Sequence, residues 1–341
     1  MSGVRRTLRS GIALAAGLAL TALLVAVVVG GWRPWAGPSS PFAGRALFVP
    51  PSSATLDAVD QLAATQPEQS QALALIGSTP QGVWLTPEAL PPGRVGDRVA
   101  ELSGQAAAAD AVVLLVLYGL PDRDCSGGLS AGGLDAADYP GWVAEVAGAA
   151  DPDHMAVVLE PDAVPQLITC GGGVDREERL GLLAGAVGVL AEAEVATYLD
   201  AGHSNWLPAE QVAPLLEQAG VASARGFATN VSNYQPESDE LAYAQRLRTA
   251  LGRAGSEAHF VVDTGRNGAG ATAGQDWCNP PGSALGRRPV AVEDGQGAAA
   301  GLDAYLWVKP PAESDGECAG GPPAGVVWPD RALALTRSGG G

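Results

Sequence analysis

Residues 112–118, Val-Val-Leu-Leu-Val-Leu-Tyr, form a continuously apolar run that leads into Arg123-Asp124-Cys125. Five further apolar runs, at residues 155–159, 195–199, 226–231, 259–262 and 304–308, also lead into polar clusters. Near-continuous Val, Leu and Ile runs are typical of parallel strands buried on both faces. In a parallel α/β barrel the reacting groups collect at the carboxyl ends of such strands. The pattern therefore predicts an α/β enzyme whose site is built from many strand ends.

Segments with helical spacing alternate with these runs. Residues 176–194 are rich in Leu, Ala and Glu, and residues 208–218 open with Pro208 and close at Gly220. Residues 238–253 open with Ser-Asp-Glu, a capping pattern. Alternating strands and helices predict a parallel sheet with helices outside it. A chain of 341 residues is long enough for one large domain of this kind.

The charge of the chain limits its partners. The formal net charge is −17 at pH 7, which disfavours nucleic acid, because binding a polyanion relies on basic patches. A neutral substrate is the better expectation. The spacing of His and Cys does not match a metal site, so we predict no metal and no cofactor, and we expect a monomer.

The amino terminus has the pattern of a membrane or export segment. No residue between Arg9 and Arg33 is charged, and about 20 apolar residues at about 1.5 Å each span a bilayer core of roughly 30 Å. We predict a basic cytoplasmic segment at 1–9, a transmembrane anchor at 10–32, a linker at 33–42, a catalytic domain at 43–336 and a tail at 337–341. The rest of the chain would then lie outside the cytoplasm. A cleaved signal peptide, and hence a secreted protein, is the alternative.

The four cysteines agree with an exported domain. They are Cys125, Cys170, Cys278 and Cys318, an even number with no C-x-x-C pair. Pairing in chain order would connect the loops that carry the polar clusters. Two other connectivities remain open from the residues alone.

Five aspartates follow predicted strands and compete for catalytic roles: Asp124, Asp162, Asp200, Asp263 and Asp315. Inverting hydrolysis of an acetal needs a proton donor and a base for water, with carboxyl groups roughly 6.5–9.5 Å apart. Several carboxyl groups in one pocket repel one another, so at least one should have a raised pKa and hold its proton near neutral pH. The residues predict an enzyme rich in carboxylates, and they do not say which carboxyl group would have which role.

Residues 118–125, Tyr-Gly-Leu-Pro-Asp-Arg-Asp-Cys, resemble the signature of family 6 of the glycoside hydrolases, the cellulases and cellobiohydrolases. Further blocks resemble the family in the same order: 159–162 (LEPD), 198–203 (YLDAGH), 226–234 (GFATNVSNY), 276–282 (DWCNPPG) and 307–316 (WVKPPAESDG). The resemblance runs from about residue 41 to about residue 334. It implies a distorted, incomplete parallel β/α barrel of about seven strands and disulfides paired in chain order.

The resemblance also implies a role for each matched residue. Asp162 matches the general acid, Asp124 the aspartate that raises the pKa of that acid and organises water, and Asp315 the proposed base, with a water relay as the alternative. The other matched residues would contact the substrate or hold water: Tyr118, Ser130, Asp200, His203, Trp206, Asn230, Trp277, Lys309 and Glu313. The substrate implied is a β-1,4-glucan or a cello-oligosaccharide.

Some positions depart from the family pattern or have simpler explanations. Ala131-Gly132-Gly133 stands where the family often has Asn-Gly-Glu, so loop closure could differ. Only two residues separate Asp315 from Cys318, which predicts a short roof, an open cleft and internal chain cutting. Asp263 is expected to be structural, with Arg266 as a possible ion-pair partner, and Trp307 is expected in the core.

Three functions follow from these observations. The first is an endo-acting, inverting β-1,4-glucanase. The second is an exo-acting cellobiohydrolase. The third, from another class, is a catalytically silent glucan-binding protein, which the altered loop after Ser130 would allow and the three matched acids disfavour.

Overall fold

The structure, a computed structural model, describes residues 40–338 except 127, 171–174, 253–256, 271–276 and 294–298. The predicted segments 1–9 and 10–32, most of the linker 33–42 and the last three residues of the tail 337–341 lie outside the described residues, as does Asp276. Among the described helices, none is long and apolar enough to cross a membrane.

Strands and helices alternate along the chain, as predicted. The strands are β1 Ala46–Leu47, β2 Val83–Leu85, β3 Ala111–Leu117, β4 Met155–Leu159, β5 Ala196–Asp200, β6 Gly226–Thr229, β7 His259–Asp263, β8 Val290–Ala291 and β9 Leu302–Leu306. The helices are α2 Ala54–Leu62, α3 Pro67–Gly77, α4 Val95–Ala108, α5 Tyr139–Gly148, α6 Ala163–Thr169, α7 Arg176–Glu192, α8 Ala209–Gln218, α9 Glu237–Ala250 and α11 Pro329–Ser338, with 3₁₀ turns η1 Asp124–Ser126 and η2 Val221–Ser223.

The strands form one mostly parallel sheet. Its order within the described residues is β1-β3-β4-β5-β6-β7-β9-β8, and β2 also pairs with β3. All neighbours are parallel except β8 and β9. All seven residues of β3 are buried, which explains its continuously apolar sequence. The six apolar runs are confirmed as β3, β4, β5, β6, β7 and β9. The three short strands β1, β2 and β8 were missed because they carry too few residues for a periodic signal.

The sheet curls into a nearly closed barrel. No ladder joins β2 to β9 in the part of the chain that the structure describes. Instead, the backbone N–H of Gly82 donates to the carbonyl of Trp307 at 2.8 Å. A Cβ at Gly82 would lie 2.3 Å from the carbonyl oxygen of Val308, so a residue without a side chain is needed at this seam. The prediction of an incomplete barrel is therefore confirmed in outline.

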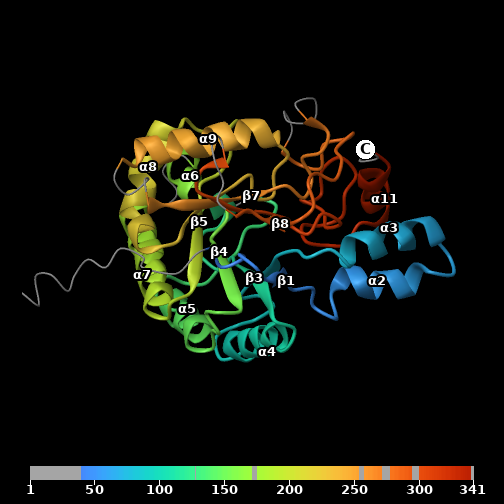
Figure 1. Ribbon diagram of the computed structural model, residues 1–341, viewed down its shortest axis with the longest axis horizontal. Helices are drawn as coiled ribbons and strands as arrows, with labels where there is room; N and C mark the ends of the chain where they lie inside the picture. Colours follow the sequence, from blue (N-terminus) through green and yellow to red (C-terminus); the bar gives the residue numbers. More distant parts are fainter. Residues whose placement is uncertain are drawn as a thin grey trace, which may run out of the picture. The chain divides into compact units, whose positions relative to one another are not determined.

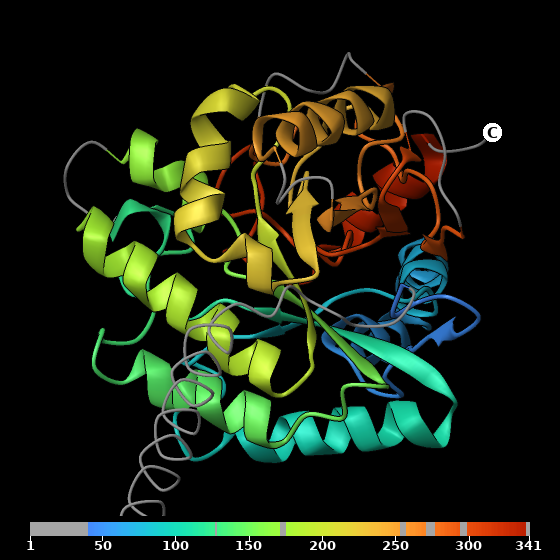
Figure 2. The same cartoon turned by 60° about the vertical axis from the view of Figure 1, so that its left-hand side comes forward.

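The helices cover the outside of the strands. Figure 1 shows α4, α5, α7, α8 and α9 around the sheet, and Figure 2 shows the same layer from another side. Alternate residues of β3 and β4 pack against Val99, Trp142 and Leu183 of these helices. Far from this layer, α11 packs beside α3, although nearly the whole chain separates them (Figure 1).

The helix boundaries agree with the sequence, apart from one cap. The side chain of Asp175 accepts from the amide of Glu178 and caps α7. The capping role expected for Ser238 is wrong: α9 begins at Glu237, and Pro236 occupies its N-cap without a side-chain hydrogen bond. The fixed φ of proline suits a helix start, which explains the earlier beginning. Trp307 lies in the core, as predicted, with 1% exposure.

Candidate active site

A cavity of about 720 Å³ opens where the parallel strands end. Ten of the twelve residues predicted to act on or contact the substrate line it: Tyr118, Asp124, Ser130, Asp162, His203, Trp206, Trp277, Lys309, Glu313 and Asp315. Asp200 and Asn230 do not. The loops after β3, β4, β5 and β9 supply nearly all of these side chains. Groups from distant parts of the sequence thus meet because parallel strands end at the same rim.

Asp162 occupies the turn between β4 and α6. Its backbone φ is 68°, and although it is the N-cap of α6, its side chain makes no capping hydrogen bond. A left-handed backbone at a non-glycine residue is strained and typical of functional turns. The backbone N–H of Asp162 donates to Asp200 Oδ2 at 2.7 Å, which helps to fix this turn.

The surroundings of Asp162 favour its protonated form. Burial, followed by the negative charges of Asp124 and Asp315, raises its pKa to about 7. A carboxylic acid that still holds its proton near neutral pH can donate it to a leaving oxygen.

Asp124 is joined to the hydroxyl of Ser130, and through it to the hydroxyl of Tyr118. The amide and the hydroxyl of Ser130 donate to Asp124 Oδ2 at 2.9 and 3.2 Å. The Ser130 hydroxyl also lies 3.1 Å from the Tyr118 hydroxyl. Burial, then the charge of Asp162, raises the pKa of Tyr118, so this phenol stays neutral. The three side chains form a hydrogen-bonded chain that could hold a water molecule.

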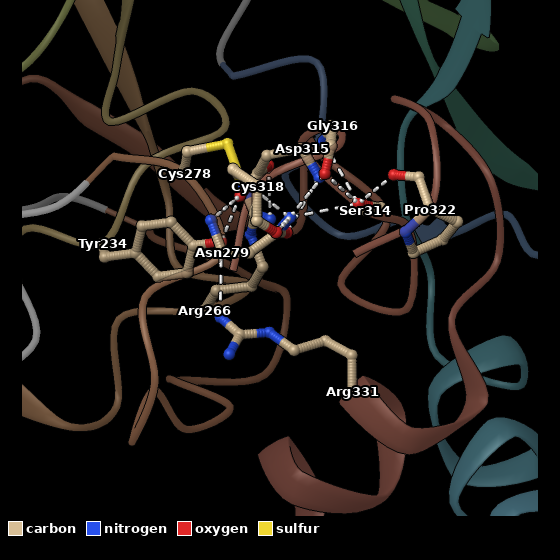
Figure 3. Close-up of a disulfide and its surroundings, with 10 residues drawn as sticks. All are labelled: Tyr234, Arg266, Cys278, Asn279, Ser314, Asp315, Gly316, Cys318, Pro322 and Arg331. Carbon is tan, nitrogen blue, oxygen red and sulfur yellow. Dashed lines mark hydrogen bonds and ion pairs between the residues drawn. A yellow bond between two sulfur atoms is a disulfide. The ribbon is translucent and has the colours of Figure 1, made fainter. Parts of the chain in front are cut away.

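Both carboxylate oxygens of Asp315 have protein partners. Arg266 Nη1 donates to Oδ1 at 2.7 Å, while the Tyr234 hydroxyl and the Asn279 amide donate to Oδ2, the latter at 3.0 Å. Figure 3 shows Arg266 and Asn279 gathered around this carboxylate. Burial acts to raise the pKa of Asp315, but Arg266 and Lys309 outweigh it, so the pKa lies below its ordinary value. Asp315 is therefore a fixed negative charge that acts on Asp162.

Asp263 is structural, but its partner differs from the one expected. Its carboxylate accepts the backbone amides of Ser232, Gly265 and Lys309 at 3.1, 2.9 and 3.0 Å. The guanidinium of Arg266 pairs with Asp315 instead. Asp263 thus ties together the loops after β6, β7 and β9.

Asp200 and Asn230 face the protein. Asp200 Oδ2 accepts the amides of Asp162 and Gly202, and Oδ1 has no hydrogen-bond partner among the described residues. Burial, then the charge of Asp162, raises the pKa of Asp200. The Asn230 side chain donates to the carbonyl of Asp263 and accepts from the amide of Gln235. As placed, both residues shape the loops of the cavity.

The sequence reasoning missed Trp84 and Glu160. Trp84 lines the cavity from β2, with its ring 5.2 Å from that of Tyr118 and 5.3 Å from Lys309 Nζ. A three-residue strand gives no periodic signal, so its role was not visible. Glu160 is buried and accepts the amides of Gly119 and Leu120, which positions the loop after β3. Glu160 belongs to the LEPD block at 159–162, but the sequence did not indicate that its side chain would bind the backbone of the loop after β3.

The remaining lining residues form an aromatic and polar wall. The rings of His203 and Trp206 lie 5.6 Å apart, and burial lowers the pKa of His203 to about 4, so this imidazole is neutral. Lys309 Nζ lies 3.6 Å from Glu313 Oε2. Trp277 is 56% exposed at the edge of the cavity. Neutral donors and flat apolar rings are suited to an uncharged ligand.

The disulfides pair in chain order. Cys125–Cys170 has a Cα–Cα distance of 5.3 Å and ties the Asp124 turn to the end of α6. Cys278–Cys318, with 6.2 Å, ties the segment of Asn279 to the loop of Asp315 (Figure 3). Each bridge therefore holds a loop that carries a cavity carboxylate.

The segment after Asp315 is short, but it is not isolated. Leu129, from the loop after β3, packs on Gly316, since a Cβ at Gly316 would lie 2.4 Å from Leu129 Cδ1. The two loops therefore touch at the border of the cavity. Within the described residues, no three His, Cys, Asp or Glu side chains are arranged so that they could hold a metal ion.

The chain is similar to named endoglucanases and cellobiohydrolases. Endoglucanase A from Cellulomonas fimi is 44% identical over 266 residues, covering 78% of this chain and 56% of that relative, so the chain spans little more than half its length. A 1,4-β-D-glucan cellobiohydrolase from Podospora anserina is 37% identical over 252 residues, 61% of this chain and 58% of the relative. The structure of an endoglucanase from Mycobacterium tuberculosis, in complex with methyl-cellobiosyl-4-deoxy-4-thio-β-D-cellobioside, matches with a TM-score of 0.79. Its sequence identity is 38%, and the match covers 89% of this chain and 100% of the other.

The strongest finding covers almost all of the described chain. The model of the glycosyl hydrolases family 6 matches residues 42–338, which include every strand and every lining residue of the cavity. With a barrel and disulfides arranged as the sequence blocks implied, the chain belongs to family 6 of the glycosyl hydrolases.

Proposed function

We propose that the protein is an endo-acting glucanase that hydrolyses β-1,4-glucosidic bonds with inversion. The observation that carries this proposal is Asp162, a buried carboxyl group with a pKa raised to about 7 in a cavity shared with two other carboxylates. Asp162 protonates the glycosidic oxygen, and the carboxylates of Asp124 and Asp315 stabilise positive charge at the sugar. Water attacks from the opposite face, with Asp315 as the proposed base.

A water relay is the alternative to direct proton transfer to Asp315. The alternative is supported by the occupied oxygens of Asp315 and by the hydrogen bond that links Ser130 to Asp124. In this version the attacking water passes its proton through a second water, held by Ser130 and Tyr118, to the carboxylate of Asp124, which accepts it. The fixed charge of Asp315 then acts through the electric field it creates in the cavity.

The test is a proton NMR time course of cellohexaose hydrolysis by the protein. Early α-anomer, with products from internal cuts, supports an inverting endoglucanase. Early β-anomer contradicts inversion, because a retaining enzyme conserves the anomeric configuration. Binding of cellohexaose without hydrolysis by the folded protein favours the silent glucan-binding alternative.

Exo action remains the second candidate. It is supported by the contact of Leu129 with Gly316, which joins two loops at the cavity border, and by the similarity to a named cellobiohydrolase. Viscosity loss of a soluble cellulose derivative, relative to reducing sugar released, separates the two. A steep early loss of viscosity supports endo action, whereas release of cellobiose with unchanged viscosity supports exo action.

The activity is expected to fall as the pH rises through about 7. The general acid must carry its proton, and the pKa of Asp162 is raised to about 7 by burial, then by Asp124 and Asp315. Replacing Asp124 by asparagine removes one of these negative charges, so the alkaline limb should move to lower pH. The pH profile of kcat/KM in both proteins measures this shift. Only the position of the alkaline limb is compared, so a lower overall activity of the variant does not affect the result. An unchanged limb in the variant would contradict the coupling of the two carboxyl groups.

Trp277 is proposed as a stacking platform for a sugar ring. Covering about 60 Å² of apolar surface at about 25 cal/mol per Å² contributes about 1.5 kcal/mol. Trp277→Ala should therefore raise KM for cellohexaose about tenfold and leave the thermal midpoint nearly unchanged. Leu75→Ala is the matched control, because Leu75 is 45% exposed on α3, outside the cavity lining. Equal KM values for both variants would contradict the stacking role.

We also propose that the domain works outside the cytoplasm as a monomer, either anchored by the segment 10–32 or secreted after its cleavage. Two disulfides support an oxidising compartment. Fractionation of cells that express the full chain tests the anchor: membrane association that resists high salt supports it, and free protein in the medium supports cleavage. Light scattering of the purified protein tests the monomer.

A further inference from the structure

The loop that carries Ser130 is held by contacts other than the hydrogen bonds among Tyr118, Ser130 and Asp124. Arg123 lies 6% exposed beneath this loop, with its guanidinium 4.4 Å from the centre of the Tyr118 ring. Its Nε donates to the carbonyl of Ser130 at 3.3 Å, and its Nη1 donates to the carbonyl of Tyr118. One side chain therefore sets the positions of both residues whose hydroxyls meet in the cavity.

Arg123 is in turn fixed by Glu88, from the segment between β2 and α4. Glu88 Oε1 accepts from Arg123 Nη2 at 2.9 Å and from the backbone amide of Gly133 at 3.1 Å. The same carboxylate oxygen thus holds the guanidinium and the far end of the loop. Burial acts to raise the pKa of Glu88, but the Gly133 amide and Arg123 outweigh it, and the pKa lies below its ordinary value. Glu88 is charged at neutral pH.

The two glycines of the loop are needed for this arrangement. A Cβ at Gly132 would lie 2.4 Å from Glu88 Oε1 and 2.6 Å from Arg123 Nη2, and the φ of 147° is unfavourable for other residues. A Cβ at Gly133 would lie 2.1 Å from the carbonyl oxygen of Leu120. The glycines allow the backbone to approach Glu88 closely enough for a hydrogen bond.

The backbone that leads into the loop of Ser130 needs support from other contacts. Asp122, Asp124 and Cys125 all have positive φ values, of 52°, 52° and 55°. Such conformations cost about 1–3 kcal/mol each and persist only where surrounding contacts determine them. Cys125–Cys170 supplies one constraint, and the contacts of Arg123 supply another.

We propose that Glu88 is a positioning residue for the proposed hydrolysis: through Arg123 and Gly133 it places the Ser130 hydroxyl against Asp124 and against the Tyr118 hydroxyl. We call Glu88, Arg123 and Gly133 the latch. The proposal rests on the proposed function. Glu88 itself need not touch the reacting atoms, and its loss acts on the rate because a displacement of about 1 Å at reacting groups can cost 10²-fold.

The test compares Glu88→Ala and Glu88→Gln with a matched control. Glu145 also accepts a glycine amide, that of Gly93, at 2.8 Å, but it lies on α5 outside the cavity lining. For Glu88→Ala we expect kcat on cellohexaose to fall about 10–100-fold with KM changed less than about threefold. The kcat of Glu88→Gln should be intermediate. Its amide oxygen can still accept from the amide of Gly133, but it carries no negative charge to pair with Arg123. Glu145→Ala should keep the kcat of the parent.

A second readout is independent of catalysis. Hydrogen exchange at the amides of Ser130 and Gly133 should accelerate at least tenfold in Glu88→Ala, and formate should restore both protection and kcat by filling the vacated carboxylate position. Unchanged exchange with an unchanged kcat overturns the latch. A raised KM with unchanged exchange also overturns it, because Glu88 would then be a substrate contact.

The two proposals fail in different ways. If the parent protein does not hydrolyse cellohexaose, the proposed function fails, and the exchange experiment still decides whether Glu88 holds the loop. Gly132→Ala adds a further check. Gly132→Ala should accelerate hydrogen exchange in the loop less when Glu88 is already alanine, because the added methyl group then no longer collides with Glu88 Oε1. Equal acceleration in both backgrounds contradicts a contact between the two.

Discussion

Replacing Asp162 by asparagine is expected to lower kcat on cellohexaose by about 10³–10⁴-fold. Asparagine keeps the size of the side chain but has no acidic proton, and a positioned general acid contributes about 10²–10⁴-fold. The loss should be at the upper end, since the leaving sugar alkoxide is a poor leaving group without protonation. The pKa of Asp162, raised to about 7 by burial and then by Asp124 and Asp315, indicates that this proton is available in the parent.

The choice of leaving group separates loss of the acid from misfolding. Dinitrophenyl and fluoride leaving groups need little protonation, so Asp162→Asn should retain most of the parent rate on cellobiosides that carry them. Asp138→Asn is the matched control, because Asp138 is exposed and, like Asp162, is an N-cap without a side-chain capping bond. Asp162 is not the acid if the variant loses activity equally on all substrates, or if its kcat on cellohexaose falls less than tenfold.

Replacing Asp315 by alanine is expected to affect both stability and activity. Arg266 is 2% exposed, and without Asp315 its charge would be buried without its ion-pair partner, keeping only the bond to the carbonyl of Ser232 and the more distant charge of Asp263. Removing one member of a buried ion pair typically costs about 3–5 kcal/mol of the free energy of unfolding. The rate on cellohexaose should fall at least 10²-fold, because a preorganised charge next to the reacting sugar is lost.

A double variant distinguishes the structural part from the chemical part. Adding Arg266→Met to Asp315→Ala removes the uncompensated charge, so urea unfolding should show that much of the lost stability returns. The activity should stay low. Return of activity along with stability would show that Asp315 acts only as the partner of Arg266.

Azide tests the direct base role of Asp315. A small anion that enters the vacated space can attack the sugar without a base, so azide should accelerate Asp315→Ala and yield a glycosyl azide of inverted configuration if Asp315 is the base. The water relay through Ser130 and Asp124 predicts no such acceleration in Asp315→Ala. Product analysis by NMR decides between them.

The main strands and the acids at their ends were predictable from the sequence. Runs such as residues 155–159 are apolar because both faces of a parallel strand are buried, and this local requirement is visible residue by residue. The positions of Asp124, Asp162 and Asp315 followed from blocks that resemble a family, and all three line one cavity. The chain-order disulfides followed in the same way.

Other features depended on contacts between distant residues. Arg266 was assigned to its sequence neighbour Asp263, but it pairs with Asp315, which is 49 residues away. Asp200 and Asn230 belong to matched blocks, yet their polar groups face backbone atoms of other loops. Glu88 lies in no recognised block. Its role follows from its contact with Gly133, 45 residues further on.

Local patterns in the sequence predicted the parallel strands and the carboxylates at their ends, because burial on both faces of a strand requires apolar residues. The family followed from the resemblance of six sequence blocks, not from these patterns. The tertiary structure decided which charges pair, which side chains reach the cavity and which residue fixes the Ser130 loop. Those outcomes depend on distances between loops after different strands. Such distances are set only when the sheet curls and brings the strand ends together, so no local pattern records them.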